Sequence, residues 1–478
     1  LKLYFEERLM VFANLLFIYL FLPLNLILYF LSKRIVYRNL VLVAFSFVFY
    51  AWGEPVWFML LLTSAAFDYM HGRLIGRFRG TWMAKAAVAS SLALNLSLLG
   101  SFKYSGFIVQ TVNDLLGTSF GVPAFALPIG ISFYTFQTIS YVVDVYRGDT
   151  EAQSNPVYYL LYLSMYHQLV AGPVVRYADV AREIRSRTVD AASFSEGLTR
   201  FVFGLAKKVL VANAAGSLAD TYMATAPANL SVGAAWFGAA LFTLQIYYDF
   251  SGYSDMAIGL GRMFGFHYKE NFNYPYIARS ATEFWRRWHI SLSSFFRDYV
   301  YIPLGGNRNH PYRNLFVVWF LTGLWHGASW NFILWGLFYG VFIMLERAFL
   351  GEWLRRIPAA FGHAYLLLLT LIGWVIFYFT DLGQLGGYLR AMFGLAGNRL
   401  WDSGVQITLL NNIFWFLLAA VFCIPIVRWL RRFVCDRLSP AKAAVLFGLQ
   451  PLLNLALLLV STAQLVGQSY NPFLYYRF

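Results

Sequence analysis

Residues 315–345 read LFVVWFLTGLWHGASWNFILWGLFYGVFIML, and this run decides the fold class. No Asp, Glu, Lys or Arg occurs between Arg313 and Glu346. A helix needs roughly 20 apolar residues to cross a bilayer, so the run is long enough to span a membrane. It also places a titratable side chain, His326, at membrane depth. Ionisable residues held there mark functional sites by default.

The composition of the whole chain points to the same class. Of its 478 residues, 59% are hydrophobic, 19% are aromatic and only 13% are charged. In soluble domains the charged share approaches about a quarter, so we predict an all-α polytopic membrane protein. The formal net charge is +14. In a membrane protein such an excess is typical of cytoplasmic loops, and we expect contact with membrane lipid and no nucleic-acid partner.

Apolar stretches recur along the chain. They lie near residues 11–32, 39–52, 55–70, 86–108, 123–146, 156–175, 194–216, 230–262, 314–345, 362–380, 407–427 and 443–466. Some are short enough to be re-entrant, so we expect about ten to thirteen membrane-embedded helices. Residues 10–478 are predicted to form a single integral-membrane domain. Residues 1–9 precede the first methionine and are interpreted as an upstream extension or an expression remnant.

Basic residues are unevenly distributed between the apolar stretches. Clusters occur at 33–38, 73–85, 176–187, 279–313 and 428–442, whereas residues 106–123 contain none. By the positive-inside rule the clusters face the cytoplasm and the N-terminus faces outward. The first apolar stretch is too long for a signal-peptide core and precedes basic residues, so it is expected to remain as a span.

His326 admits two interpretations. It can be a core histidine that hydrogen-bonds to a neighbouring helix, as in many membrane bundles. Alternatively, Gly323 and Gly327 bracket it and would admit a backbone or a substrate, while Trp325 and Trp330 would add flat apolar walls. Removal from water favours the neutral imidazole, which can accept a proton from an attacking hydroxyl. The second interpretation makes His326 a catalytic residue.

A second histidine, His289, lies in FWRRWHISLSSFFRDY at residues 284–299. At helical spacing Trp285, Trp288 and Phe296 fall near one stripe, which fits an amphipathic helix in the membrane interface. The arginines would then face water or lipid phosphates. The functional alternative is a cationic mouth for an anionic acyl donor, because arginine binds phosphate through paired donors.

The segment 247–279 mixes carboxylates, glycines and aromatic residues at the end of an apolar run. Gly252 could break a helix there, and irregular backbone at that depth would line a cavity open to the cytoplasmic side. Asp249 and Asp255 are about 120° apart around a helix, so they do not form a paired-carboxylate site. They are expected to be structural carboxylates, either hydrogen-bonded or ion-paired, with Arg262 or Arg279 as candidate partners. Lys207 and Lys208 are expected to snorkel to the headgroups.

Other chemistries have little support. The two cysteines, Cys423 and Cys435, lack C-x-x-C spacing, and no H-x-x-x-H or E-x-x-H grouping occurs, so no metal site is expected. Ser251 and Ser254 lack the G-x-S-x-G arrangement of a hydrolase nucleophile.

Five motifs occur in a fixed order. They are LPIGISFYTFQTISYVVDVYRG at 127–148, QLVAGPVVR at 168–176, DFSGYSDMAIGLGRMFGF at 249–266, FWRRWHISLSSFFRDYVYIPLGGNR at 284–308 and GLWHGASWNFILWGLFYG at 323–340. Their order and spacing closely resemble the membrane-bound O-acyltransferase family, specifically its alginate O-acetyltransferase subunit type. The resemblance runs from about Met10 to the C-terminal apolar stretches, and the segment 284–340 is highly specific.

The resemblance implies a ring of helices around a thin centre, where a cytoplasmic funnel meets an outer opening. His326 would sit at the constriction, and His289 matches the family's second characteristic histidine or asparagine position. Two departures concern the substrate subtype. His167 stands where the family often has proline before Q-L-x-A-G-P, and residues 378–380 replace a frequent F-R-A.

The resemblance also implies a function. An O-acetyltransferase of the bacterial inner membrane would pass an acetyl group from a cytoplasmic donor, most plausibly acetyl-CoA as substrate, toward an extracytoplasmic polysaccharide such as alginate. No bound cofactor is expected. A separate periplasmic or membrane-anchored transferase and the exopolysaccharide machinery would be partners. Donor phosphates would meet Arg286, Arg287 and Arg297. The channel would be lined by Trp285, Trp288, Trp325, Asp249, Ser254 and Asp255.

Alternatives remain open from sequence. The same fold could acetylate peptidoglycan or cellulose, or move D-alanine onto teichoic acid. A transporter of a glycan or lipid intermediate would also carry intramembrane ionisable residues. Transporters commonly show internal repeats with interrupted helices in matching positions, and we find none in this sequence.

Overall fold

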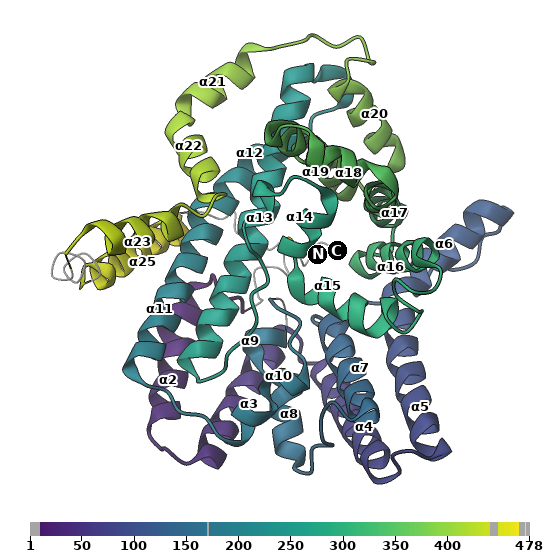
Figure 1. Ribbon diagram of the computed structural model, residues 1–478, viewed down its shortest axis with the longest axis vertical. Helices are drawn as coiled ribbons and strands as arrows, with labels where there is room; N and C mark the ends of the chain where they lie inside the picture. The colour runs from purple at the N-terminus through teal and green to yellow at the C-terminus, as the bar shows by residue number, and fades with distance from the viewer. Residues whose placement is uncertain (1–9, 170–171, 440–447, 468–473, 475–478) are drawn as a thin grey trace. The chain divides into compact units, whose positions relative to one another are not determined.

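The computed structural model describes residues 10–169, 172–439, 448–467 and 474 (Figure 1). Every regular secondary-structure element in these ranges is a helix. The chain divides into two compact units. Unit 1 comprises residues 1–201 and 253–269, and unit 2 comprises residues 202–252 and 270–478. Residues 1–9 lie outside the described residues, so their interpretation stays a prediction, as does the single-domain assignment.

Unit 1 is built from the N-terminal helices. They are η1 (Phe17–Phe21), α2 (Leu22–Phe30), α3 (Ile35–Gly53), α4 (Phe58–Arg77), α5 (Trp82–Leu99), η2 (Gly100–Tyr104), α6 (Ser105–Leu116), α7 (Ile131–Arg147), α8 (Pro156–Ser164), α9 (Tyr166–Leu169) and α10 (Tyr177–Arg185). Two further helices, α11 (Ala191–Ala206) and α13 (Val232–Met263), each contribute residues to both units.

The helices α4, α5 and α7 pack together in unit 1 (Figure 1). Their contact includes a fully buried carboxylate, Asp68, which accepts hydrogen bonds from Ser91 Oγ at 2.6 Å and Asn95 Nδ2 at 2.9 Å. A buried charge without such donors would be costly. This polar contact therefore fixes the pairing of α4 with α5 inside an apolar bundle.

Unit 2 contains the remaining helices. They are η3 (Lys207–Ala212), α12 (Asn213–Met223), η4 (Pro227–Asn229), η5 (Pro275–Ile277), α14 (Ala281–Arg287), α15 (Ile290–Phe296), η6 (Arg297–Tyr301), α16 (Pro311–His326), α17 (Trp330–Leu345), η7 (Glu346–Leu350), α18 (Gly351–Arg356), α19 (Ala359–Tyr378), α20 (Leu382–Met392), α21 (Ser403–Asn411), α22 (Ile413–Phe422), α23 (Ile426–Arg437) and α25 (Gln450–Gly467).

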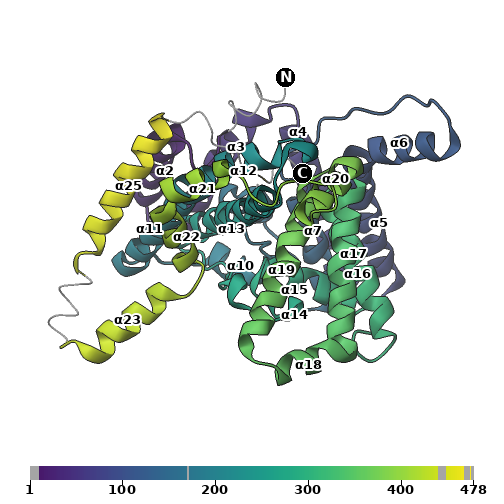
Figure 2. The same cartoon turned by 90° about the horizontal axis from the view of Figure 1, so that it is seen from above.

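The decisive apolar run forms a helical hairpin, with α16 and α17 side by side and α19 next to α17 (Figure 2). Gly336 lies against the Trp319 carbonyl oxygen, and a Cβ there would come within 2.9 Å of the Gly323 Cα. The two backbones approach closely because neither glycine carries a side chain. This contact confirms the prediction that Gly323 admits a neighbouring backbone. Gly327 instead lies against the Phe332 ring.

Among the described residues, six helical segments are long and apolar enough to cross a membrane, or seven if the bent pair α21 and α22 counts as one span. The chain is thus a multi-pass all-α membrane protein, as predicted. The count of ten to thirteen embedded helices, the ring and the funnel stay predictions. One predicted stretch, residues 156–175, is not a single helix, because α8 ends at Ser164 and α9 begins at Tyr166.

Two local predictions are wrong. Residues 284–299 do not form one interfacial helix, since the chain breaks between α14 and α15 and the side chains of Trp285 and Trp288 are buried in the core of unit 2. Gly252 does not break α13, which runs without interruption to Met263. A Cβ on Gly252 would lie 2.8 Å from the Gly204 carbonyl oxygen, so this glycine serves close packing.

Candidate functional site

His326 is the last residue of α16, at the turn into α17. Its side chain is buried, with 9% of the residue exposed. Three aromatic rings surround the imidazole, with centroid distances of 5.0 Å to Trp325, 4.8 Å to Trp335 and 5.3 Å to Phe377. The predicted aromatic wall is confirmed for Trp325, whereas Trp330 is largely exposed. A low-dielectric pocket of this kind favours a neutral imidazole.

His289 lies at the break between α14 and α15 and is 1% exposed. Its φ is 45°, in the left-handed region that few non-glycine residues adopt. The ring lies 6.0 Å from the ring centroid of Trp325, which also contacts His326. The structure therefore brings both predicted histidines to the same indole. A single helix through this segment could not have done so.

The proton position on His289 follows from its neighbours. Asn271 Oδ1 accepts hydrogen bonds from the Ser291 backbone N–H at 3.3 Å and from Ser291 Oγ at 2.8 Å. The same oxygen lies 3.1 Å from His289 Nδ1, so Nδ1 carries the proton and donates it. Burial also lowers the pKa of His289 to about 3. The imidazole is thus neutral at physiological pH, with the lone pair on Nε2.

Other buried indoles of unit 2 pack around this centre. Trp285 contacts Trp319 at 4.9 Å and Trp335 at 5.4 Å, and Trp288 contacts Trp374 at 4.8 Å. Trp285, Trp319, Trp335 and Trp374 come from α14, α16, α17 and α19, and Trp288 directly follows α14. They exclude water from the two imidazoles, which strengthens any electrostatic interaction in the site. The assignment of Trp285, Trp288 and Trp325 to a channel wall stays a prediction.

Two positioning residues were not singled out from the sequence. Glu346, at the end of α17, accepts hydrogen bonds from the backbone N–H groups of Ala281 at 2.6 Å and Thr282 at 2.8 Å, which begin α14. Asn331 Nδ2 donates to the carbonyl oxygens of Ile376 at 3.2 Å and Phe377 at 3.0 Å. The sequence did offer a signal for each residue. Glu346 is a carboxylate directly after the apolar run, and Asn331 is an amide inside it.

The three predicted donor-binding arginines differ in their surroundings. Arg287 pairs with Glu283 at 2.8 Å and also donates to the Asn273 carbonyl oxygen at 3.1 Å. Arg297 is exposed and pairs with Asp298 at 2.6 Å. Arg286 is exposed at the C-terminal end of α14. Only Arg286 has no carboxylate within ion-pair distance among the described residues, so it is the one best placed for an external anion.

The two aspartates of α13 form ion pairs, as predicted, but with other partners. Asp249 lies 2.7 Å from Lys208 Nζ, and Asp255 lies 2.8 Å from Arg200 Nη2. Arg262 instead pairs with Glu196. The prediction that Lys208 snorkels to the headgroups is wrong, because its side chain is buried against Asp249.

Ser254, the remaining predicted channel residue, is buried in α13 within unit 1. Asp249 lies on the same helix within unit 2, and its second oxygen accepts the Leu474 backbone N–H at 2.8 Å. The channel role of Asp249, Ser254 and Asp255 stays a prediction.

The chemistry open to the site follows from its two buried imidazoles. A neutral ring nitrogen can accept a proton from a hydroxyl or can attack an activated acyl carbon. Within the described residues no group of three histidine, cysteine, aspartate or glutamate side chains could hold a metal ion. Proton transfer and nucleophilic attack by imidazole are therefore the reactions that these residues can perform by themselves.

Comparison with known proteins identifies relatives along nearly the whole chain. Residues 151–382 match the family model described as MBOAT, membrane-bound O-acyltransferase family. A probable alginate O-acetylase AlgI from Azotobacter vinelandii is 41% identical, over 98% of this chain and 100% of the relative. A probable alginate O-acetylase AlgI from Pseudomonas aeruginosa is 44% identical, over 83% of this chain and 79% of the relative. The peptidoglycan O-acetyltransferase of Helicobacter pylori is 34% identical, over 80% of both chains.

Proposed function

Because the chain belongs to the membrane-bound O-acyltransferase family, we propose that this O-acyltransferase passes an acetyl group from a cytoplasmic donor across the membrane for O-acetylation of alginate. Identity of about 41% over the full length of a probable alginate O-acetylase supports this acceptor. Family membership also favours group transfer over the transport function considered from the sequence.

One observation carries the catalytic part of the proposal. His326 and His289 both lie against the Trp325 ring, at 5.0 Å and 6.0 Å between ring centroids. Both histidines are at least nine-tenths buried. Titratable side chains are rare in such apolar surroundings and are retained there for chemistry. We assign His326 as the catalytic residue. We assign His289 as the residue that assists it by hydrogen-bonding to the substrate.

Two schemes use these residues. In the first, His326 takes the proton of an accepting hydroxyl, whose oxygen bonds to the acyl carbon while the donor's thiolate leaves and is protonated. In the second, an imidazole nitrogen of His326 bonds to the acyl carbon as the carbon–sulfur bond breaks, and the thiolate leaves with the imidazolium proton. The hydroxyl oxygen then bonds to the acyl carbon, the carbon–nitrogen bond breaks, and the hydroxyl proton passes to the released imidazole. In this second scheme His289 Nε2 can accept a hydrogen bond from the hydroxyl, whereas in the first scheme that single proton goes to His326.

The donor is proposed to be acetyl-CoA, bound as substrate on the cytoplasmic side. Arg286 supports this proposal, because it is exposed at the end of α14, the helix that leads directly to His289. Guanidinium groups bind phosphate through paired donors. The cluster of basic residues at 279–313 supports a cytoplasmic location for this end of the site, and a bacterial inner-membrane location for the protein.

The acceptor end of the pathway is proposed to involve a partner. A separate periplasmic or membrane-anchored acetyltransferase would take the acetyl group to the polysaccharide within the exopolysaccharide machinery. The relatives named as alginate O-acetylases support this exopolysaccharide context. Peptidoglycan is a second candidate acceptor, since a peptidoglycan O-acetyltransferase is 34% identical to the chain.

The test replaces His326 with alanine in cells that depend on this protein for alginate acetylation. Loss of a general base or nucleophile is expected to lower acetyl incorporation by roughly 10²–10⁴-fold, while the variant stays folded and inserted in the membrane. Acetyl groups on purified polysaccharide are measured by NMR. The matched control is His267→Ala, which removes an exposed histidine paired with Glu183 and should leave acetylation unchanged. Normal acetylation in the His326→Ala strain would reject the assignment.

A further inference from the structure

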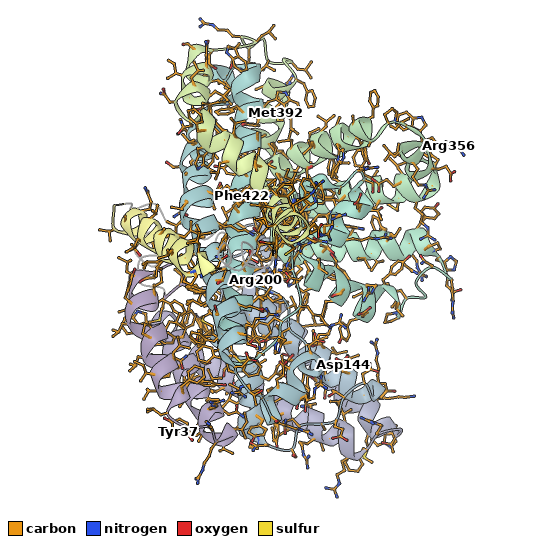
Figure 3. All side chains as sticks on the ribbon, turned by 60° about the vertical axis from the view of Figure 1, so that its left-hand side comes forward. Tyr37, Asp144, Arg200, Arg356, Met392 and Phe422 are labelled. Carbon is orange, nitrogen blue, oxygen red and sulfur yellow. The ribbon has the colours of Figure 1, made fainter. Side chains whose placement is uncertain are left out.

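The helix α23 (Ile426–Arg437) lies between two apolar helices of unit 2. Before it comes the bent pair α21 and α22, which ends at Phe422 (Figure 3), and after it comes the candidate span α25. Figures 1 and 2 show α23 projecting away from α14, α16 and α17. Because both neighbours are apolar enough to lie in a bilayer, α23 is held close to a membrane surface.

The sequence of α23, IVRWLRRFVCDR, separates into two faces. At about 100° per residue, Trp429, Leu430 and Phe433 share one face with Ile426 and Val434, and the last residue of the helix, Arg437, falls on the same face. The opposite face carries Arg428 and Cys435 at its centre and Arg431 and Arg432 at its two borders. All three large apolar side chains are exposed in the structure, by 51% for Trp429, 60% for Leu430 and 59% for Phe433.

The charge of α23 identifies what covers this apolar face. The helix carries four arginines and one aspartate, and it begins the basic cluster at residues 428–442. Clusters of this sign face the leaflet that carries anionic lipid. An amphipathic helix with tryptophan and phenylalanine on one face and arginine on the other binds in the plane of such a surface.

One contact links α23 to the candidate site. Arg428 Nη1 donates to Asn273 Oδ1 at 3.1 Å, and its guanidinium lies 5.1 Å from the centre of the Tyr274 ring. Asn273 follows Asn271, the residue that orients His289, by two positions. Arg428 therefore contacts the loop that orients His289.

We propose that α23 is a docking surface for the anionic phospholipid headgroups of the cytoplasmic leaflet. Trp429, Leu430 and Phe433 enter the boundary between headgroups and acyl chains, while Arg432 reaches the lipid phosphates from the border of the polar face. This surface is separate from the acyl-transfer reaction, and its test does not depend on that activity.

The test uses the full-length protein in nanodiscs of phosphatidylcholine, with or without phosphatidylglycerol. The chain has two cysteines, of which Cys423 is buried and Cys435 is exposed, so Cys435 accepts a fluorescent label directly on the polar face. A second sample carries Cys435→Ser with Phe433→Cys, which puts the label on the apolar face. Quenching by lipid-attached nitroxides reports membrane contact, and quenching by iodide reports contact with water.

The label at position 433 is expected to be quenched by lipid nitroxides, more strongly with phosphatidylglycerol and less at high salt, while the label at Cys435 is quenched by iodide. Arg432→Gln should lower the ratio of docked to undocked helix by roughly 5-fold in phosphatidylglycerol. The matched control is Arg356→Gln on α18, where the arginine pairs with Glu352.

Three outcomes with the label at position 433 would overturn the proposal. Iodide quenching without lipid quenching at position 433 would place α23 in water. Equal lipid quenching with and without phosphatidylglycerol would remove the role of the headgroup charge. Shielding of position 433 from both quenchers would show that protein covers this face. The label on native Cys435 needs no substitution in α23. If the Phe433→Cys variant fails to fold, protection of the Cys435 label from iodide remains an outcome that overturns the proposal.

Discussion

His289 holds a backbone conformation that few side chains tolerate, and the hydrogen bond from its Nδ1 to Asn271 fixes which ring nitrogen carries the proton. Histidine and asparagine are among the non-glycine residues that most often occupy the left-handed region. Both also carry an N–H that can donate to Asn271 Oδ1. Local backbone geometry and site chemistry therefore select the same two residues at this position.

The lowered pKa of His289 predicts a specific pH dependence of stability. Unfolding returns the imidazole to its usual pKa of 6.5, whereas burial holds the folded value at about 3. Between these values the unfolded chain binds a proton that the folded chain does not, so stability falls as the pH falls below 6.5, by up to about 1.4 kcal/mol per pH unit. His289 lies outside the candidate spans. Detergent-solubilised protein is used for the measurement.

The measurement compares apparent melting temperatures of the wild type and of His289→Asn at about pH 7 and about pH 5.5. Asparagine keeps the backbone conformation and the donor but does not titrate in this range. The wild type is expected to lose more stability on acidification than the variant. An equal loss in both proteins would mean that burial does not lower the pKa of His289 in the folded state.

The candidate histidines could be identified from the sequence, but their partners could not. A charge-free apolar run and its histidine point directly to His326. Asn271, by contrast, lies 18 positions before His289 in a loop, and only the folded chain brings it within 3.1 Å. The ion-pair partners Lys208 and Arg200 were missed for the same reason, since sequence spacing does not show which helices are neighbours.

The short helix α14 depends on Glu346 for its placement. The carboxylate accepts four hydrogen bonds, from two backbone N–H groups at the start of α14, from Thr282 Oγ1 and from the Tyr365 hydroxyl. Hydrogen bonds to charged groups are about twice as strong as neutral ones. Glu346 therefore joins the end of α17 to the helix that carries Trp285 and leads to His289.

Replacing Glu346 with alanine should lower the free energy of unfolding by about 2–4 kcal/mol, because the buried donors lose their acceptor. Activity should fall as well, since α14 positions the aromatic wall. Glu352→Ala is the matched control. It removes an exposed glutamate that pairs with Arg355 and Arg356, so its effect should be within about 1 kcal/mol. Thermal unfolding in detergent measures the stability of both variants. Equal losses of stability would contradict the proposal that Glu346 places α14.

The contact between α16 and α17 is equally testable. A methyl group at Gly336 would meet the backbone of Trp319 and Gly323, and backbone cannot move aside as a flexible side chain can. Gly336→Ala should therefore destabilise the protein by about 1–3 kcal/mol and displace His326, which ends α16. The control is Gly386→Ala in α20, where a Cβ meets nothing within 4 Å.

That control should leave stability unchanged or raise it by about 0.4–1 kcal/mol, because alanine restricts the unfolded chain more than glycine does. Melting temperature and acetyl transfer are measured for both variants. A Gly336→Ala protein as active and as stable as the Gly386→Ala protein would show that α16 and α17 tolerate a wider separation.

Across the molecule, the helix class and the membrane location could be predicted from composition and apolar periodicity. The positions at which individual helices begin and end could not be predicted. Short elements such as α14 and α15 are stabilised by tertiary contacts that local sequence does not encode. The 284–299 segment shows this clearly. Its amphipathic pattern predicts a surface helix, yet its tryptophans are buried against other aromatic rings of unit 2.

The ion pair between Lys208 and Asp249 is a long-range contact within unit 2, with 4% and 2% of the side chains exposed. Lys208→Met should cost about 3–5 kcal/mol, because it leaves a buried carboxylate without its cation. Adding Asp249→Asn should recover part of that loss. The control Arg262→Met breaks an exposed pair and should cost at most about 1 kcal/mol. Additive losses in the double variant would show that the pair is not coupled.

The left-handed turn at His289 has a consequence for anyone who varies this enzyme by saturation mutagenesis. Branched or bulky replacements there will be eliminated by steric strain in the main chain before their reactivity is ever sampled. A survey that scores survival at this codon will thus report on tolerated torsion angles, whereas the asparagine variant, which keeps the turn, reports what the ring itself contributes to turnover.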